Sequence, residues 1–293
     1  MNRALYISTN CFKDRSPAGI LTAVQESRWT HIEFSAIRAS PEEAISLCRQ
    51  LRSQNVQTVL HNYFPPAEEP FLLNLASLDS HLLGRSLRHC EEAILLSAEL
   101  GAPFFAAHAG FLTDPPPFLL GDADGLRRFC RERRTSRSEK EANDIFRESV
   151  KRLTQYAVRQ GVRFLIENHV VEEGLDPDTA RSLLLCLEAA EFCELAKEIG
   201  QQSFGILLDA GHLRCTSRAL GFTKEQFCTA ISPWIQSFHL SENDGLRDWH
   251  QPFDADAWFL GIVRSRPELP ATLEFNRCST DKILKSMQLL QES

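Results

Sequence analysis

The run RFLIENH (163–169) places a glutamate and an asparagine at the end of an otherwise apolar segment. Seven other short runs resemble it in being rich in apolar, β-branched and aromatic residues; they span 4–9, 30–36, 58–63, 104–110, 204–212, 237–243 and 271–276. Runs that are apolar almost throughout are typical of parallel strands covered on both faces. The sequence therefore predicts eight buried parallel strands.

Stretches with helical spacing separate most of these runs. PEEAISLCRQLRSQ (41–54) follows a Ser-Pro capping signal, and the stretches 86–101 and 144–161 each end on glycine, a frequent helix stop. Eight alternating strand and helix units predict an α/β protein with a single closed (β/α)8 TIM barrel. Because no repeat, linker or change in composition interrupts the chain, we expect one domain over residues 1–293.

The overall composition limits the class of protein. A length of 293 residues is ordinary for one such barrel, and an apolar share of 43% is enough for a large core. The net charge of −7 argues against a general duplex-DNA binder, since such proteins gain affinity by neutralising phosphates. A local basic patch on an acidic protein still leaves nucleic acid open as a partner.

The sequence also bears on location. Its first residues, MNRALYISTN, lack an apolar signal core, and no stretch approaches the roughly 18 apolar residues of a membrane span. Nine cysteines are scattered without a C-x-x-C pair, which predicts free thiols in a reducing compartment. We therefore expect a cytoplasmic protein without a membrane partner, and a homodimer is compatible with this sequence.

Three long connections, 111–140, 170–203 and 244–260, follow expected strand ends, where barrel enzymes build lids and specificity elements. The segment 127–140 is strongly basic through Arg127, Arg128, Arg131, Arg133, Arg134, Arg137 and Lys140. We interpret this segment as a solvated helix or mobile loop, and the alternative is a phosphate-binding lid.

Potential metal ligands stand at the ends of these strands or shortly after them. They are His61, His108, Glu167, Asp209, His212, His239, Asp248, His250 and Glu274. All strands of a barrel point their carboxyl ends at one mouth, so these side chains should converge there. Carboxylates that are buried together repel one another and lose solvation, and a cation would neutralise them.

Taken singly, these residues are weak evidence. Asp209 could equally cap a helix. Glu167 and Glu274, however, interrupt runs that should be buried, and an unpaired buried carboxylate is costly. The pattern therefore predicts a divalent cation at the mouth, with Mn²⁺, Zn²⁺, Co²⁺ or Fe²⁺ suited to mixed oxygen and imidazole ligands and Mg²⁺ to a carboxylate-rich set.

Short motifs strengthen this interpretation as an ordered set. They are LHNYFPP (60–66), AAHAGF (106–111), LIENH (165–169), LLDAGHL (207–213), FHLSENDG (238–245), DWH (248–250) and LEF (273–275). With them, almost the whole chain resembles the xylose isomerase-like barrel superfamily. That superfamily includes sugar and sugar-phosphate isomerases and epimerases and the endonuclease IV type of AP endonuclease.

The resemblance to the isomerase and epimerase branch implies one metal, held by four ligands from the last four strands: Glu167, Asp209, His239 and Glu274. It also implies that the two glutamates move protons, one on each face of the bound sugar. A metal that chelates a carbonyl and its neighbouring hydroxyl acidifies the C–H between them and stabilises the enediolate. The expected function is a metal-dependent isomerase or epimerase of a sugar or sugar phosphate.

In this interpretation the remaining polar residues at the mouth contact the small-molecule substrate, and we assign that role to His61, His108, Asn168 and His212. Asp248 and His250 bind substrate or a further metal, and His61, His108 and His212 are possible ligands of a further metal as well. Asn243 either binds a sugar hydroxyl or fixes a loop, while Trp249, Trp258 and Phe64 either stack on a sugar ring or pack. No glycine-rich nucleotide motif follows a strand, so no nucleotide cofactor is expected.

The resemblance to the endonuclease branch implies instead that nine ligands hold three zinc ions. The matching positions are His61, His108, Glu167, Asp209, His212, His239, Asp248, His250 and Glu274, and all nine residue types are present. The ligand count therefore leaves a multinuclear phosphodiesterase open. Against it stand the stretch LRCTSRALGF (213–222), which departs from that branch's pattern, the short segment between His239 and Asp248, and the acidic net charge. A non-catalytic, sensory barrel is a third reading, which the intact Glu167 and Glu274 pair disfavours.

Overall fold

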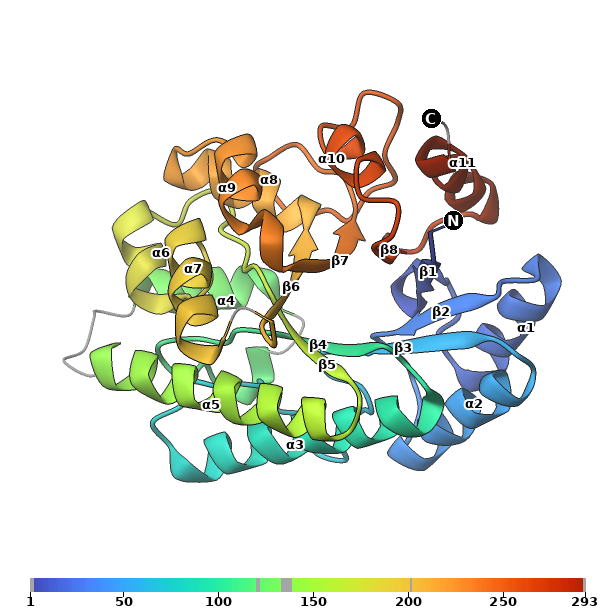
Figure 1. Cartoon of the computed structure of the whole chain (residues 1–293), viewed down its shortest axis with the longest axis horizontal. Helices are drawn as coiled ribbons and strands as arrows, with labels where there is room; N and C mark the ends of the chain where they lie inside the picture. Colours follow the sequence, from blue (N-terminus) through green and yellow to red (C-terminus); the bar gives the residue numbers. More distant parts are fainter. Residues whose placement is uncertain (1–2, 120–121, 133–138, 201, 292–293) are drawn as a thin grey trace.

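The structure is a computed structural model that describes residues 3–119, 122–132, 139–200 and 202–291. Within them, parallel strands close into a barrel in sequence order, with β1 pairing to both β2 and β8 (Figure 1). The strands are β1 Leu5–Ser8, β2 His31–Phe34, β3 Gln57–His61, β4 Phe104–His108, β5 Arg163–Glu167, β6 Gly205–Asp209, β7 Ile235–Leu240 and β8 Ala271–Leu273. The predicted (β/α)8 barrel is confirmed.

Helices surround the barrel (Figure 1). They are α1 Pro17–Ser27, α2 Pro41–Ser53, α3 Ser80–Leu100, α4 Ala123–Glu132, α5 Glu139–Arg159, α6 Pro177–Leu183, α7 Ala189–Ile199, α8 Ala210–Leu220, α9 Lys224–Ile231, α10 Leu260–Arg264 and α11 Thr280–Gln291. The described residues also contain short 3-10 turns, namely η1 Thr9–Cys11, η2 Pro117–Leu119 and η3 Ser232–Trp234. The predicted capping signal is present, because Ser40 and Glu43 form a capping box at the start of α2.

The strands are shorter than the apolar runs that predicted them, chiefly at their carboxyl ends. The run 204–212 contains strand only to Asp209, whose side chain accepts a hydrogen bond from the His212 backbone N–H at 2.7 Å and so caps α8. His212 therefore stands in the first turn of a helix rather than on a strand. The sequence run hides this boundary, because Asp209 is both the last residue of β6 and the N-cap of α8, and the apolar pattern continues across it.

The long connections carry additional structure. The connection after β4 holds η2 and α4, and the one after β5 holds α6 and α7. The predicted phosphate-binding lid falls largely on residues 133–138, which lie outside the described residues, as do the side chains of Arg127 and Arg131.

An apolar cluster fills the barrel below its mouth. Val59, Ala106, Leu165 and Leu207 belong to it, and each is at most 1% exposed. Alternate residues of a strand share a face, so the residue two positions further along each strand points to the same interior. Those residues are His61, His108, Glu167 and Asp209. The apolar core therefore lies directly beneath the polar strand ends.

The cysteines whose side chains are described are all free, and most are buried, as the sequence predicts. Burial raises the pKa of the buried thiols, for example that of Cys228 to about 12. The side chain of Cys130 lies outside the described part. Among the described residues, no helix is long and apolar enough to span a membrane.

Gly110, two residues after the end of β4, has a φ of +99°. A Cβ at this position would lie 2.5 Å from Asn74 Oδ1 and 3.1 Å from the Leu75 backbone nitrogen. Asn74 Oδ1 is held there because it accepts hydrogen bonds from the backbone N–H groups of Ala76 and Phe111. The turn that carries the chain away from His108 therefore depends on a glycine.

We expect Gly110→Ala to lower the free energy of unfolding by about 1–3 kcal/mol, because it combines a strained φ with a backbone clash. Urea denaturation measures the change. Gly261→Ala in α10 is the control, since a Cβ there meets nothing within 4 Å and alanine favours helix. Equal midpoints for the two variants would contradict the assigned role of Gly110.

Candidate metal centre

The barrel delivers its polar residues to the mouth in register. His108 pairs with Glu167 across β4 and β5, and Asp209 pairs with His239 across β6 and β7. Glu274 follows β8 directly. Residues from five strands that are far apart in sequence thus become neighbours, as the topology predicts.

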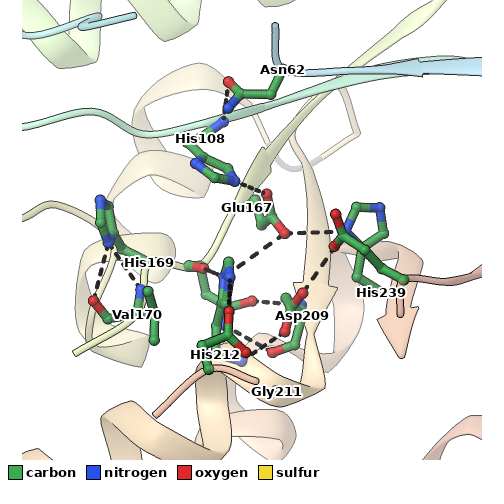
Figure 2. Close-up of polar contacts among 12 residues, drawn as sticks. Asn62, His108, Glu167, His169, Val170, Asp209, Gly211, His212 and His239 are labelled. Atoms are coloured by element: carbon green, nitrogen blue, oxygen red, sulfur yellow. Dashed lines mark hydrogen bonds and ion pairs between the residues drawn. The ribbon is translucent and has the colours of Figure 1, made fainter. Parts of the chain in front are cut away.

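The central group consists of Glu167, Asp209, His239 and Glu274, and one possible ligand atom from each lies within 4.8 Å of the others. His239 Nδ1 is 2.9 Å from Glu274 Oε2, 3.3 Å from Glu167 Oε1 and 3.8 Å from Asp209 Oδ2. The four residues are at most 5% exposed. Figure 2 shows Glu167, Asp209 and His239 directed toward one another.

Several atoms of this group have unmet bonding capacity. Glu167 Oε1, Asp209 Oδ2 and His239 Nδ1 are buried and have no well-aligned hydrogen-bond partner among the described residues. Buried polar atoms are normally satisfied, and adjacent buried carboxylates repel one another. One cation in contact with all of these atoms would remove both problems, so the residues present fit a divalent metal.

Three further groups adjoin the central one: Glu33 and His61 with His239 and Glu274, His61 and His108 with Glu167, and His212 with Asp248 and His250. His61 Nε2 and His108 Nε2 are each 2.8 Å from Glu167 Oε2, so Glu167 belongs to both this group and the central group. On the other side, Asp248 Oδ2 lies 3.2 Å from His212 Nε2 and 2.9 Å from His250 Nε2. The structure therefore brings all nine residues singled out in the sequence into one continuous polar cluster.

The electrostatics of the cluster follow from burial and mutual contact. Burial alone would raise the pKa of Glu167, but the imidazoles of His108 and His61 hold it well below its usual range. The pKa of Asp209 rises to about 6, because burial and Glu167 outweigh the opposing charge of His212. Burial opposes protonation of His239, yet Glu33 and Glu274 raise the pKa of its imidazole well above the ordinary value. Positive charge is thus strongly favoured at the centre of the mouth.

A similar balance holds at the rim. Burial disfavours the charged form of His250, but the Asp248 carboxylate raises its pKa to about 10. The pKa of Asp248 is lowered by His250 and His212 despite burial.

The asparagines at the mouth make scaffold contacts. Asn168 Oδ1 accepts from the Asp209 backbone N–H at 2.8 Å, and its amide donates to the Asp209 carbonyl at 3.0 Å. Asn243 donates to the Gly211 carbonyl at 2.9 Å. These contacts tie strand ends and loops together, and the contact of Asn168 with substrate stays a prediction.

The three aromatic residues considered for stacking differ in position. Phe64 is fully buried and packs against Phe34. Trp258 is partly buried, with the Lys224 ammonium over its ring. Trp249 is 48% exposed, so of these three it alone presents a large surface to solvent.

Sequence reasoning missed Glu33 in β2. Its Oε2 lies 2.7 Å from His239 Nε2 and accepts a hydrogen bond from the Thr272 hydroxyl at 3.0 Å. Since the Nδ1 of His239 faces the central group, Glu33 fixes the orientation and tautomer of the imidazole, as carboxylates behind metal-binding histidines do. The signal was available, because Glu33 interrupts the apolar run THIEFSA just as Glu167 interrupts its own run.

The chain belongs to the family of xylose isomerase-like TIM barrels, whose model matches residues 22–291. Solved structures share the fold at low identity. A D-tagatose 3-epimerase-like protein is 16% identical, with 99% of this chain and 96% of that chain covered and a TM-score of 0.70. The 3-keto-D-glucoside 4-epimerase of E. coli is 12% identical, with 99% and 98% covered and a TM-score of 0.65.

A protein from Thermus thermophilus, soaked with ZnCl2, is 19% identical, with 100% of this chain and 99% of that chain covered and a TM-score of 0.62. At such identities the likeness establishes the fold alone. None of the curated proteins matches the chain.

We expect Glu33→Gln to weaken divalent-metal binding about tenfold or more, because the neutral amide no longer holds His239 in its metal-facing form. A competition titration with a chelator measures the affinity. Glu26→Gln, at an exposed position on α1, is the matched control and should bind metal as the unmodified chain does. Unchanged affinity in Glu33→Gln would contradict the positioning role.

Proposed function

We propose that this protein is a divalent-metal-dependent isomerase or epimerase of a sugar or sugar phosphate. The observation that carries the proposal is the central group, in which Glu167 and Glu274 flank Asp209 and His239 in strand order. In the proposal, these two carboxylates face the bound substrate from either side. That arrangement suits removal of a proton on one face of a substrate carbon and its return on the other.

A bound divalent ion would supply the positive charge that acidifies a C–H beside a carbonyl and stabilises the resulting enediolate. Three carboxylates and one imidazole are compatible with Zn²⁺, Mn²⁺, Co²⁺ or Mg²⁺. No nucleotide cofactor is part of the proposal.

The chain's own residues prepare both glutamates for proton transfer. His61 and His108 contact Glu167 Oε2, which keeps the carboxylate ionised and fixes its orientation. Asn10 donates to Glu274 Oε1 at 2.9 Å, which fixes the second carboxylate. The His108 side chain is 38% exposed, and we infer that it meets the substrate at the open side of the mouth.

The relatives in fold support the class of reaction. Solved neighbours are named as epimerases of L-ribulose and of a 3-keto-D-glucoside. Epimerisation of these sugars requires proton transfer at a carbon, which is the chemistry proposed for this site. We therefore infer that the substrate is a small sugar.

The test is to incubate the metal-loaded protein with a panel of ketoses, aldoses and their phosphates in D₂O. We expect deuterium at a carbon beside the carbonyl of at least one substrate, detected by NMR or mass spectrometry. Glu274→Gln should lose about 10²–10⁴-fold of that rate, as expected when a general acid or base is removed. The absence of deuterium uptake across the whole panel would refute the proposal.

A second candidate is a multinuclear phosphodiesterase of the AP endonuclease type. The specific observation in its favour is that the nine expected ligands fall into several adjoining groups, two of which share Glu167. Neighbouring metal ions can stabilise the attacking and leaving oxygens of a phosphodiester at the same time.

Metal analysis separates the two candidates. The isomerase predicts one tightly held metal per chain, whereas the phosphodiesterase predicts about three zinc ions. Incubation with an abasic-site duplex completes the comparison. Cleavage together with the higher stoichiometry would favour the second candidate, and an intact duplex with one metal would favour the first.

A further inference from the structure

Three arginines follow the strands β1, β2 and β8 without taking part in the polar cluster. Arg15 precedes α1, Arg38 precedes α2 and Arg277 precedes α11. Each therefore stands between a strand end and the following helix, on the side of the barrel where the metal ligands gather. Figure 1 shows α1 and α2 on the same side of the molecule as α11.

Asn10 in η1 joins this arginine cluster (Arg15, Arg38 and Arg277) to the candidate site. Its Oδ1 accepts from Arg15 Nη1 at 3.2 Å, its carbonyl accepts from the Arg277 backbone N–H at 3.0 Å, and its amide donates to Glu274 Oε1. The Arg38 backbone N–H donates to the Arg15 carbonyl at 2.8 Å. One asparagine side chain thus separates a guanidinium from a proposed catalytic carboxylate.

The arginine cluster holds positive charge without a carboxylate partner. In the described part of the chain, no ion pair joins any of the three guanidiniums to an acidic group. Asp14 is affected by the Arg38 charge, but its carboxylate accepts from the backbone N–H of Ser16. Burial and the charges of Arg277 and Arg38 lower the pKa of Arg15, as expected where like charges are held together. An anion would relieve this repulsion.

A cavity of about 680 Å³ is lined by one arginine of the cluster, Arg277, and by the metal-site residue His250, whereas Arg15 and Arg38 lie outside its lining. Its lining includes Arg277, Lys13, Lys282 and Lys285. Asp254, also in the lining, pairs with Lys285 at 2.6 Å, which leaves the cavity with an excess of positive charge. The volume is sufficient for a sugar with a charged substituent.

We propose that the arginine cluster binds the phosphate group of the substrate, so that the protein acts on a phosphorylated sugar rather than a free one. This inference rests on the proposed isomerase or epimerase function and specifies its substrate. A planar guanidinium matches the oxygens of a phosphate, and several cations around one dianion are typical of phosphate recognition. Because Asn10 contacts both Arg15 and Glu274, a phosphate bound at Arg15 would leave the sugar carbons close to the Glu274 carboxylate.

The first measurement is binding by calorimetry to the metal-loaded protein, with inorganic phosphate and with ketose phosphates and the matching free ketoses as probes. We expect the ketose phosphates to bind at least about tenfold more tightly than the free ketoses. Arg15→Gln, Arg38→Gln and Arg277→Gln should each weaken phosphate and ketose-phosphate binding by at least about tenfold, with little effect on the free ketoses.

Arg163→Gln is the matched control, because this exposed arginine begins β5 at the opposite end of the barrel. Circular dichroism and the midpoint of thermal unfolding show whether each variant is folded. Arg38 and Arg277 are exposed, so their variants should retain the fold even if loss of the part-buried Arg15 does not allow it.

The outcomes distinguish this inference from the function on which it rests. If phosphate binding depends on the arginines but no substrate exchanges deuterium, the proposed isomerase function is refuted and the arginine cluster remains an anion-binding site. Exchange on free sugars with phosphate affinity unchanged in all three arginine variants would keep the isomerase and overturn the phosphate subsite. Phosphate binding that requires the metal but not the arginines would also overturn the phosphate subsite. So would a protein that cleaves an abasic-site duplex and does not bind ketose phosphates.

Discussion

The imidazole of His239 lies between carboxylates, and the arrangement of the barrel mouth depends on this placement. Its Nε2 contacts Glu33, and its Nδ1 faces Glu167, Asp209 and Glu274. Four carboxylates that are at most 5% exposed share this space. Such a concentration of buried negative charge is stable only with compensating positive charge, which protonated imidazoles or a divalent metal can provide. The barrel interior below is apolar, so the compensation must come from the mouth itself.

This constraint explains why the site can be located in the sequence. Glu167 and Glu274 interrupt apolar runs, and a barrel brings every strand end to one place, so a cluster of ligands follows from the strand pattern alone. All nine expected residues do gather there. Glu33 escaped notice although it gives the same signal, because a single glutamate in a strand is also compatible with an ordinary structural contact.

Other features lay beyond sequence reasoning for physical reasons. The role of Asn10 depends on three contacts, to Arg15, Arg277 and Glu274, that only the closed barrel creates. The position of His212 in a helix depends on the cap that Asp209 provides. The nature of the reaction depends on how many ions share Glu167, and the identity of the ligands does not determine that number. The location of the chemistry is therefore better defined by the chain than the chemistry itself.

Charge also organises the surroundings of the cluster. The central group is acidic, whereas the loops after β1, β2 and β8 present arginines to the same mouth. A substrate with a metal-binding carbonyl end and an anionic end would satisfy both regions at once. The strand ends of the barrel carry the acidic ligands, and the loops after β1, β2 and β8 carry the arginines.

The central claim is that Glu167, Asp209, His239 and Glu274 hold a divalent metal. Anomalous diffraction from crystals of the metal-loaded protein tests it most directly. The account predicts a strong anomalous peak in contact with ligand atoms of all four residues, and its loss in crystals of Glu167→Gln. Crystals that are saturated with Mn²⁺ or Zn²⁺ and show no peak among these four side chains would contradict it.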